Sequence, residues 1–271
     1  MPQIRSLSRR QLLRAASASL LAASICPVAL LAGERQSPDS HFFVLNDLHY
    51  VGEPCGQFLQ KVIAQMKAAK EKPDLCLLAG DLSDNGTPQQ LTAVRDLLKT
   101  LGIPVRVICG NHDYVRNNDR APFMDIFPDA LNYVFDHRGW QFVGLDTCDG
   151  TKAQVTIPHP TFAFLDYTLH RLDRKRPIAL FTHFPLGPGM PNRPPNAPRL
   201  LDLFKDHNLQ AVFSGHHHGL KECKLGPTTF TTNRCCSLLQ QNHDGSKEKG
   251  YFLCHAKDGA ITRQFVEAPA P

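Results

Sequence analysis

Five short polar blocks along the chain contain side chains that can bind metal ions and move protons. They are Asp47-Leu48-His49, Gly80-Asp81-Leu82-Ser83-Asp84, Gly110-Asn111-His112-Asp113, His183 and Gly215-His216-His217-His218. Carboxylate, imidazole and amide ligands together suit borderline divalent metals such as Mn, Fe(II), Co or Zn, whereas a thiolate-rich set would indicate structural zinc. The set is too large for one tetrahedral ion but matches two ions that share a carboxylate. Such a centre can clamp a phosphoryl group and make hydroxide available at neutral pH.

Each block follows a short apolar run that predicts a β-strand. The five predicted strands are His41–Leu45, Leu75–Ala79, Val105–Cys109, Ile178–Phe181 and Gln210–Phe213. In open α/β sheets, the strand ends form the crevice in which ligands bind. We therefore expect the five blocks to deliver their Asp, His and Asn side chains to one place.

Amphipathic segments separate the strands and predict helices that pack on the sheet. The first helix should span Phe58–Lys70, because Leu59, Ile63 and Met66 recur at helical spacing. The other predicted helices are Pro88–Leu101, with Pro88 in its first turn, Phe162–Arg174 and Pro198–His207. This alternation predicts an α/β fold.

The remaining segments complete one domain. Gln141–Leu145 predicts a further strand, and the Pro- and Gly-rich stretch Pro185–Pro198 predicts an irregular loop. In the tail, Thr228–Thr232, Tyr251–Ala256 and Ala260–Val266 predict closing antiparallel strands. No internal repeat or linker divides the chain, so residues 34–271 are expected to form a single domain.

The first 33 residues have the pattern of an export signal. Arg5 to Arg14 form a basic start, and Ala15 to Ala32 form an apolar run that is short for a permanent span. The basic part contains Ser8-Arg9-Arg10-Gln11-Leu12-Leu13, which resembles the twin-arginine signal. We expect an exported, periplasmic protein that engages the twin-arginine machinery and has no stable membrane span after processing. A membrane anchor or a Sec signal is the alternative.

Composition and charge restrict the class of protein. Of the 271 residues, 42% are hydrophobic and 20% charged, which is ordinary for a globular domain. The net charge of +5 is mild and partly local to the N-terminus, so no nucleic-acid partner is expected. Eight cysteines follow Cys26, none with C-x-x-C spacing, so a cysteine zinc site is disfavoured and disulfide pairing stays open. Cys76 and Cys109 lie in apolar runs and are expected to be buried.

Taken together and in this order, the five blocks resemble the signature of the calcineurin-like metallophosphoesterases, over about two-thirds of the chain. The resemblance implies two stacked mixed β-sheets flanked by helices and two divalent ions, for example Mn, Fe or Zn. The run Gly80–Leu98, with Leu145-Asp146-Thr147, is similar to the class III cyclic-nucleotide phosphodiesterase branch. Purple acid phosphatases, a related branch, carry a Tyr at the position of Asp84, so that subgroup is disfavoured.

The resemblance also implies a role for each residue. The expected ligands are, for the first metal, Asp47, His49 and His218; for the second, Asn111, His183 and His216; and Asp81 for both. His112 would hydrogen-bond the phosphoryl oxygens or protonate the leaving group, and Asp84 would pair with His112. The nucleophile would be a metal-bound hydroxide that attacks phosphorus in line.

Other polar residues near the blocks are assigned no such role. His217 should point away from its two neighbours, and Asp113 is expected to cap or orient a loop. Asp146, at a strand end, is expected to be structural. The expected function is hydrolysis of a small phosphate ester, with a diester favoured over a monoester. A non-catalytic metal-binding relative is the alternative, and hydrolysis of another bond, such as an amide, is disfavoured by the order of the blocks.

Overall fold

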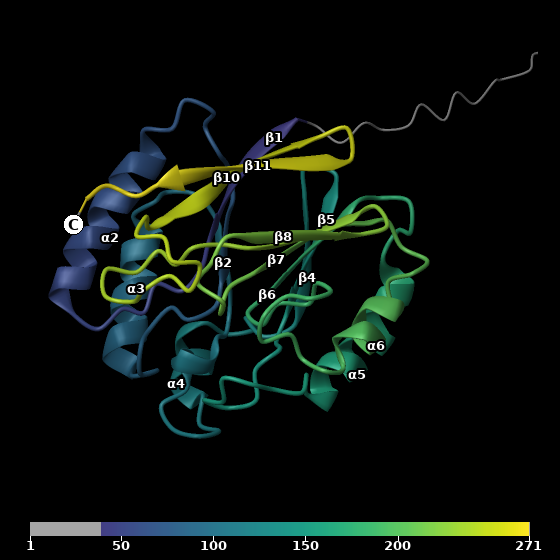
Figure 1. Cartoon of the computed structure of the whole chain (residues 1–271), viewed down its shortest axis with the longest axis horizontal. Coiled ribbons are helices and arrows are strands. Elements are labelled where there is room, and N and C mark those ends of the chain that lie inside the picture. Colours follow the sequence, from purple (N-terminus) through teal and green to yellow (C-terminus); the bar gives the residue numbers. More distant parts are fainter. Residues whose placement is uncertain (1–38, 271) are drawn as a thin grey trace, which may run out of the picture. The chain divides into compact units, whose positions relative to one another are not determined.

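The computed structural model describes residues 39–270, which lie within one compact unit. The predicted signal segment, residues 1–33, lies outside the described residues. Two mixed β-sheets stack face to face, with helices on both outer faces (Figure 1). The expectation of two stacked, helix-flanked sheets is therefore confirmed.

The first sheet has five strands in the order β11-β10-β1-β2-β3. Three of them run parallel: β1 (Ser40–Leu45), β2 (Cys76–Ala79) and β3 (Val105–Ile108). The hairpin of β10 (Gly250–Lys257) and β11 (Ala260–Glu267) adds to β1 in antiparallel pairing. This hairpin confirms two of the predicted antiparallel tail strands.

The second sheet has six strands in the order β4-β5-β6-β7-β9-β8. Four of them run parallel: β5 (Trp140–Leu145), β6 (Ile178–Thr182), β7 (Leu209–Ser214) and β9 (Thr228–Thr232). At the two edges, β4 (Tyr133–His137) and β8 (Lys221–Leu225) pair in antiparallel fashion. Thr228–Thr232 is a strand, as predicted, and it pairs with β8 in antiparallel fashion. Its predicted grouping with the two tail strands was wrong, because it lies in the second sheet, parallel to β7, whereas β10 and β11 lie in the first.

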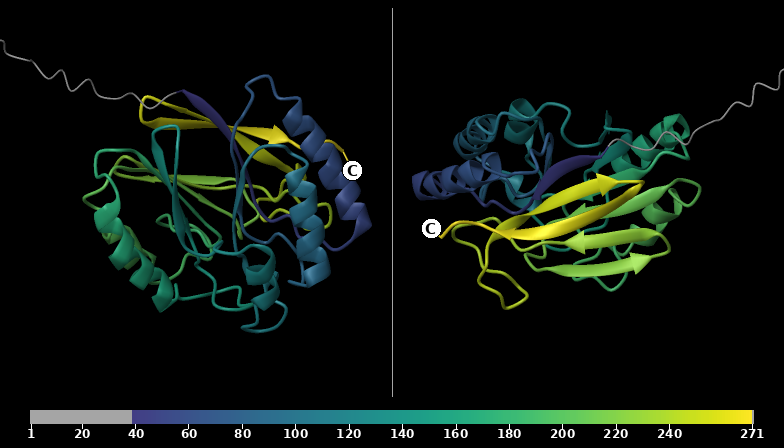
Figure 2. Two further views of the ribbon diagram at one scale, coloured as in Figure 1. Left: turned by 180° about the vertical axis from the view of Figure 1, so that it is seen from behind. Right: turned by 90° about the horizontal axis from the view of Figure 1, so that it is seen from above.

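Helices α2 (Glu53–Lys67) and α3 (Pro88–Lys99) cover the outer face of the first sheet, and α4 (Ala121–Ile126) lies near them. Helices α5 (His159–Thr168) and α6 (Ala197–Asp202) cover the second sheet (Figures 1 and 2). Short 3-10 turns, η1 (Asn111–Asp113) and η2 (Leu169–Arg171), complete the fold.

Three apolar layers hold these elements together. Phe42 and Phe181 lie in the layer between the sheets, where Phe42 packs edge-on against Phe142 and Phe213. Leu78 contributes to the layer under α2 and α3, and Leu180 to the layer under α5 and α6. Because β2 and β6 are covered on both faces, residues Cys76–Ala79 and Ile178–Phe181 are continuously apolar rather than alternating. The polar ligand residues Asp81 and His183 therefore come only after these apolar runs.

Element ends differ from the predictions for local reasons. Helix α2 begins at Glu53, five residues early, because an acidic residue and Pro54 occupy its first turn. Helix α6 stops at Asp202, since the following residues close tighter turns, such as Phe204 N–H to Leu201 O at 3.0 Å. No helix among residues 39–270 is long and apolar enough to cross a membrane.

Candidate metal centre

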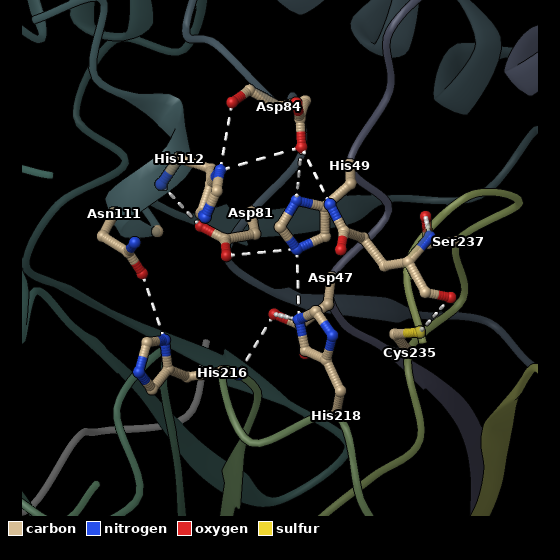
Figure 3. Close-up of polar contacts among 12 residues, drawn as sticks. Asp47, His49, Asp81, Asp84, Asn111, His112, His216, His218, Cys235 and Ser237 are labelled. Carbon is tan, nitrogen blue, oxygen red and sulfur yellow. Dashed lines mark hydrogen bonds and ion pairs between the residues drawn. The ribbon is translucent and has the colours of Figure 1, made fainter. Parts of the chain in front are cut away.

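The five polar blocks meet at the carboxyl ends of the parallel strands, as the strand-end argument predicts. Asp47 and His49 follow β1, Asp81 follows β2, and Asn111 follows β3. From the second sheet, His183 follows β6, and His216 and His218 follow β7. Figure 3 shows the side chains of Asp47, His49, Asp81, Asn111, His216 and His218 converging from separate loops.

The backbone of these loops is held in an unusual conformation. Five of the converging residues have positive φ: Asp47 (54°), His49 (44°), Asp81 (52°), His216 (63°) and His218 (47°). A left-handed conformation costs a non-glycine residue about 1–2 kcal/mol. Such strain persists where the surrounding structure enforces it, which is common at functional sites.

Glycines next to the ligands make room for this crowding. A Cβ atom on Gly110 would lie 2.1 Å from Asp81 Oδ1 and 2.2 Å from Asp81 N. A Cβ atom on Gly80, whose φ is +84°, would lie 2.5 Å from His183 Nδ1. Only glycine therefore permits the close approach of backbone and ligand side chains at these two positions.

The first group of ligand atoms comes from Asp47, His49, Asp81 and His218. His49 Nε2 lies 3.1 Å from His218 Nε2 and 3.4 Å from Asp81 Oδ2. His218 Nε2 lies 3.6 Å from Asp47 Oδ1. All four residues are buried. Two ring nitrogens and two carboxylate oxygens thus surround one point, as the ligands of a single ion would.

The second group comes from Asp81, His183 and His216, with the amide of Asn111 between them. His183 Nε2 lies 3.3 Å from Asp81 Oδ2 and 2.9 Å from Asn111 Oδ1. His216 Nδ1 lies 3.1 Å from the same amide oxygen. Because Asp81 belongs to both groups, its carboxylate can bridge two ions.

Each of the four histidines is oriented by a hydrogen bond from its outward nitrogen. Nδ1 of His49 donates to Asp84 Oδ1 (3.0 Å) and Nδ1 of His183 to Ala79 O (3.0 Å). Nε2 of His216 donates to Ala153 O (3.0 Å), and Nδ1 of His218 to Gln241 O (3.2 Å). Carbonyl and carboxylate oxygens only accept, so the inward nitrogen of each neutral ring is free to bind a metal ion.

Charge in the metal-free site is balanced by protons. Burial raises the pKa of Asp47, but His218 and His183 outweigh burial and hold that pKa at about 2. Burial lowers the pKa of His183 and His218, but Asp81 raises the first to about 9 and Asp47 raises the second to about 11. Burial, with the charge of His183, lowers the pKa of His216 to about 4.

Buried carboxylates require a positive partner. Among residues 39–270, no Lys or Arg lies within ion-pair distance of Asp47 or Asp81, which contact only histidines and main-chain or amide N–H groups. The donor set, the shared carboxylate and the oriented rings therefore fit two divalent cations.

The position of Asp84 differs in part from the predicted pairing with His112. The carboxylate oxygen Oδ1 of Asp84 lies 3.0 Å from His49 Nδ1 but 3.7 Å from His112 Nδ1. The main-chain oxygen of Asp84 accepts the hydrogen bond from His112 Nδ1, at 3.0 Å. Asp84 thus orients a metal ligand with its side chain and His112 with its backbone.

Residues that the sequence did not single out hold the site in place. Asn46 Nδ2 donates to Asp47 Oδ2 (2.6 Å), and Gln240 Nε2 donates to Asp84 Oδ1 (3.1 Å). Asn46 directly precedes the ligand Asp47, and this position in the sequence could have marked it as part of the site. Gln240 lies far along the chain in a segment without regular structure, and nothing in its surroundings marks it.

The neighbouring polar residues have structural contacts. Asp113 accepts hydrogen bonds from the backbone of Leu82, Ser83 and Gly110, so it ties the second block to the third. Asp146 is buried and forms an ion pair with Arg120. His217 belongs to neither ligand group, and its ring lies 6.0 Å from that of His243.

The cysteines do not add ligands to the centre. All eight cysteines among residues 39–270 are free thiols, and Cys76 and Cys109 are buried, as predicted. A separate Asp39, His41 and His255 group lies at the surface end of β1 and β10, away from the centre.

Comparison with known proteins agrees with this geometry. The model of the calcineurin-like phosphoesterase family matches residues 40–220. A probable cyclic nucleotide phosphodiesterase of Synechococcus is 28% identical over 69% of this chain and 76% of its own. A glycerophosphodiester phosphodiesterase of Enterobacter lignolyticus is 27% identical over 72% of this chain and 73% of its own.

Solved structures show the same fold. A purple acid phosphatase from yellow lupin superposes with a TM-score of 0.61 at 14% identity, over 86% of this chain and 52% of its own. The family match spans all five blocks and both ligand groups. The chain therefore belongs to the calcineurin-like phosphoesterase family.

Proposed function

We propose that this protein hydrolyses phosphodiesters at a centre of two divalent metal ions, with Mn, Fe(II) or Zn as the resident metals. The observation that carries the proposal is the carboxylate of Asp81, which is shared by two ligand groups that are otherwise complete. When bound, two such ions supply Lewis-acid polarisation of the phosphoryl group and activation of water. The similarity to a cyclic nucleotide phosphodiesterase and a glycerophosphodiester phosphodiesterase favours diesters over monoesters.

The protein's own contribution begins with a rigid, preorganised site. The outward hydrogen bonds of His49, His183, His216 and His218 fix their rings before substrate arrives. Their positions therefore need not reorganise during the reaction, which is the main requirement for electrostatic stabilisation of developing charge.

His112 is the group placed to handle a proton. Its side chain is 40% exposed, and its Nδ1 donates to Asp84 O, so Nε2 is the nitrogen left for substrate. In the imidazolium form, Nε2 can donate to a phosphoryl oxygen or to the departing alcohol oxygen. Its ring centroid lies 4.6 Å from that of His49, so this donor stands beside the first ligand group.

The test is hydrolysis of bis(p-nitrophenyl) phosphate and p-nitrophenyl phosphate after chelation and reconstitution with Mn, Fe(II) or Zn. We expect metal-dependent turnover with a preference for the diester, lost in Asp81→Ala and reduced about 10²- to 10⁴-fold in His112→Ala. Two bound ions without hydrolysis of either ester would instead favour a non-catalytic relative. Preference for the monoester would refute the diesterase assignment.

We also propose export through the twin-arginine route, on the basis of Ser8-Arg9-Arg10-Gln11-Leu12-Leu13. Fractionation of cells that express the full chain tests this proposal. The protein should reach the periplasm, and replacing Arg9 and Arg10 by Lys should retain it in the cytoplasm. Export that continues in the Lys variant would contradict the route.

A further inference from the structure

A pocket of about 340 Å³ adjoins a segment that contacts the second ligand group. Its lining residues are Gln154, Val155, Met190, Asn192, Arg193 and Pro195. One wall begins at the site, because Ala153, which accepts the hydrogen bond from His216, directly precedes Gln154. The other wall lies on the loop that follows His183. The volume falls within the range of about 300–1,000 Å³ that is usual for small-molecule sites.

The two walls are fixed to each other. Asn196 accepts a hydrogen bond from Ile157 N and donates one to Ile157 O, both at 3.0 Å. The pocket is therefore formed before a ligand enters, which lowers the entropic cost of binding.

Arg193 provides an unmatched positive charge in this pocket. Its Nε donates to Leu186 O at 2.7 Å, which holds the guanidinium in place. Within the described part of the chain, no carboxylate lies within ion-pair distance of Arg193, and no lining residue is acidic. Partial burial lowers the pKa of Arg193, although the group stays charged at neutral pH.

The chemistry of the lining suits one kind of ligand. The terminal nitrogens of an arginine held through Nε can bind a phosphate or carboxylate in a two-pronged manner. Gln154 and Asn192 add amide donors, while Val155 and Met190 offer apolar contact to a sugar or alkyl group. The pocket therefore fits an organic substituent that ends in an anion.

We infer that this pocket binds the substituent that stays on the phosphorus during hydrolysis, and that Arg193 binds a second anionic group on that substituent. The inference rests on the proposed function and names its substrate class: phosphodiesters with a further negative charge. The retained substituent is favoured because His112, which can donate to the departing oxygen, lies beside His49 of the first ligand group, whereas the pocket adjoins His216 of the second.

Two p-nitrophenyl esters test this inference. The p-nitrophenyl ester of thymidine 5′-monophosphate and its 3′-phosphorylated counterpart share one leaving group and differ only by a phosphate on the retained nucleoside. We expect the 3′-phosphorylated ester to have the higher kcat/KM, by about 10- to 100-fold, mainly through a lower KM.

In Arg193→Gln, the ratio of kcat/KM for the 3′-phosphorylated ester to that for the unphosphorylated ester should fall toward one. Arg193→Lys should keep part of this ratio. Arg199→Gln is the matched control, since Arg199 lies on the adjacent helix, stacks on Phe162 at 4.5 Å and does not line the pocket. It should keep the ratio of the wild-type protein. A thermal melt of each variant shows whether the domain keeps its stability.

The outcomes are separable. Equal kcat/KM for the two esters in the wild-type protein, or a ratio that survives Arg193→Gln, overturns the role of the pocket while leaving the proposed function intact. If the same wild-type preparation does not hydrolyse bis(p-nitrophenyl) phosphate, the proposed function is refuted, and the inference about the pocket with it.

Discussion

Metal binding to this protein should release protons, and the number follows from the site. In the metal-free protein, the pKa of His183 is raised to about 9 and that of His218 to about 11, because each ring faces a buried carboxylate. Both rings are therefore charged at pH 7. A histidine binds metal only in its neutral form. The pKa of His216 is lowered to about 4, so this ring has no proton to give up.

Loading both sites at pH 7 should thus release about two protons from these rings. Deprotonation at pH 7 costs about 3 kcal/mol at His183 and about 5 kcal/mol at His218, at 1.36 kcal/mol per pH unit. This deprotonation free energy makes the free energy of metal binding at pH 7 less favourable by the same amount. As the pH rises from 7 to 9, the cost at each site falls, so each apparent affinity should rise about tenfold per pH unit.

Isothermal titration calorimetry with Mn in buffers of different ionisation enthalpy measures the proton count directly. The slope of observed enthalpy against buffer enthalpy should give about two protons at pH 7 and fewer above pH 9, where His183 is already neutral. Release of no protons at pH 7, with two ions bound, would refute the claim that protons balance the buried carboxylates. An affinity that is flat between pH 7 and 9 would refute it as well.

Three further predictions concern the support of the site. Gly110→Ala should abolish metal loading and turnover, because its Cβ would lie 2.1 Å from Asp81 Oδ1; Gly52→Ala, where nothing lies within 4 Å, is the control and should retain both. Asp84→Asn should weaken metal binding about 10- to 100-fold in a competition assay, since His49 loses its carboxylate partner, and an unchanged affinity would contradict this role. The pKa values of His183 and His218 are higher in the folded protein than the value of about 6.5 in the unfolded chain. Their protonation therefore stabilises the metal-free fold fully below pH 6.5, and this stabilisation is lost as the pH rises through 9 and 11. The Tm of the metal-free protein should fall above pH 7, and a Tm that stays flat would contradict this prediction.

Much of the site could be predicted because its ligands directly follow strands in the sequence. Parallel strands that are buried on both faces have apolar sequences, so the first polar residue after each strand stands out. Asp47, Asp81, Asn111, His183 and His216 lie at or just beyond such ends. Their convergence then follows from the topology of the sheets.

The partners of these ligands could not be predicted in the same way. Whether the carboxylate of Asp84 lies nearer to His49 or to His112 depends on side-chain directions where three loops meet. Gln240 reaches Asp84 across 156 residues, from a segment with no periodic pattern. Such contacts depend on tertiary packing, which short-range spacing does not report.

Sequence patterns also failed to predict two strands of the second sheet, β4 and β8. Strands β4 and β8 lie at the edges of the second sheet and are mostly half-buried or exposed, so they carry polar residues such as Asp136 and Glu222. Edge strands commonly carry charge that blocks further pairing. The apolar signal that revealed the interior strands is therefore weak in these two.

Metal content and diester turnover, measured together on reconstituted protein, test the two-metal centre most directly. A His255→Ala background keeps the surface Asp39, His41 and His255 group from adding to the metal count. We predict two ions per chain, turnover of bis(p-nitrophenyl) phosphate that requires both, and loss of both properties in Asp81→Ala. A chain that binds no metal ion, or that hydrolyses the diester equally well after chelation, would contradict this expectation.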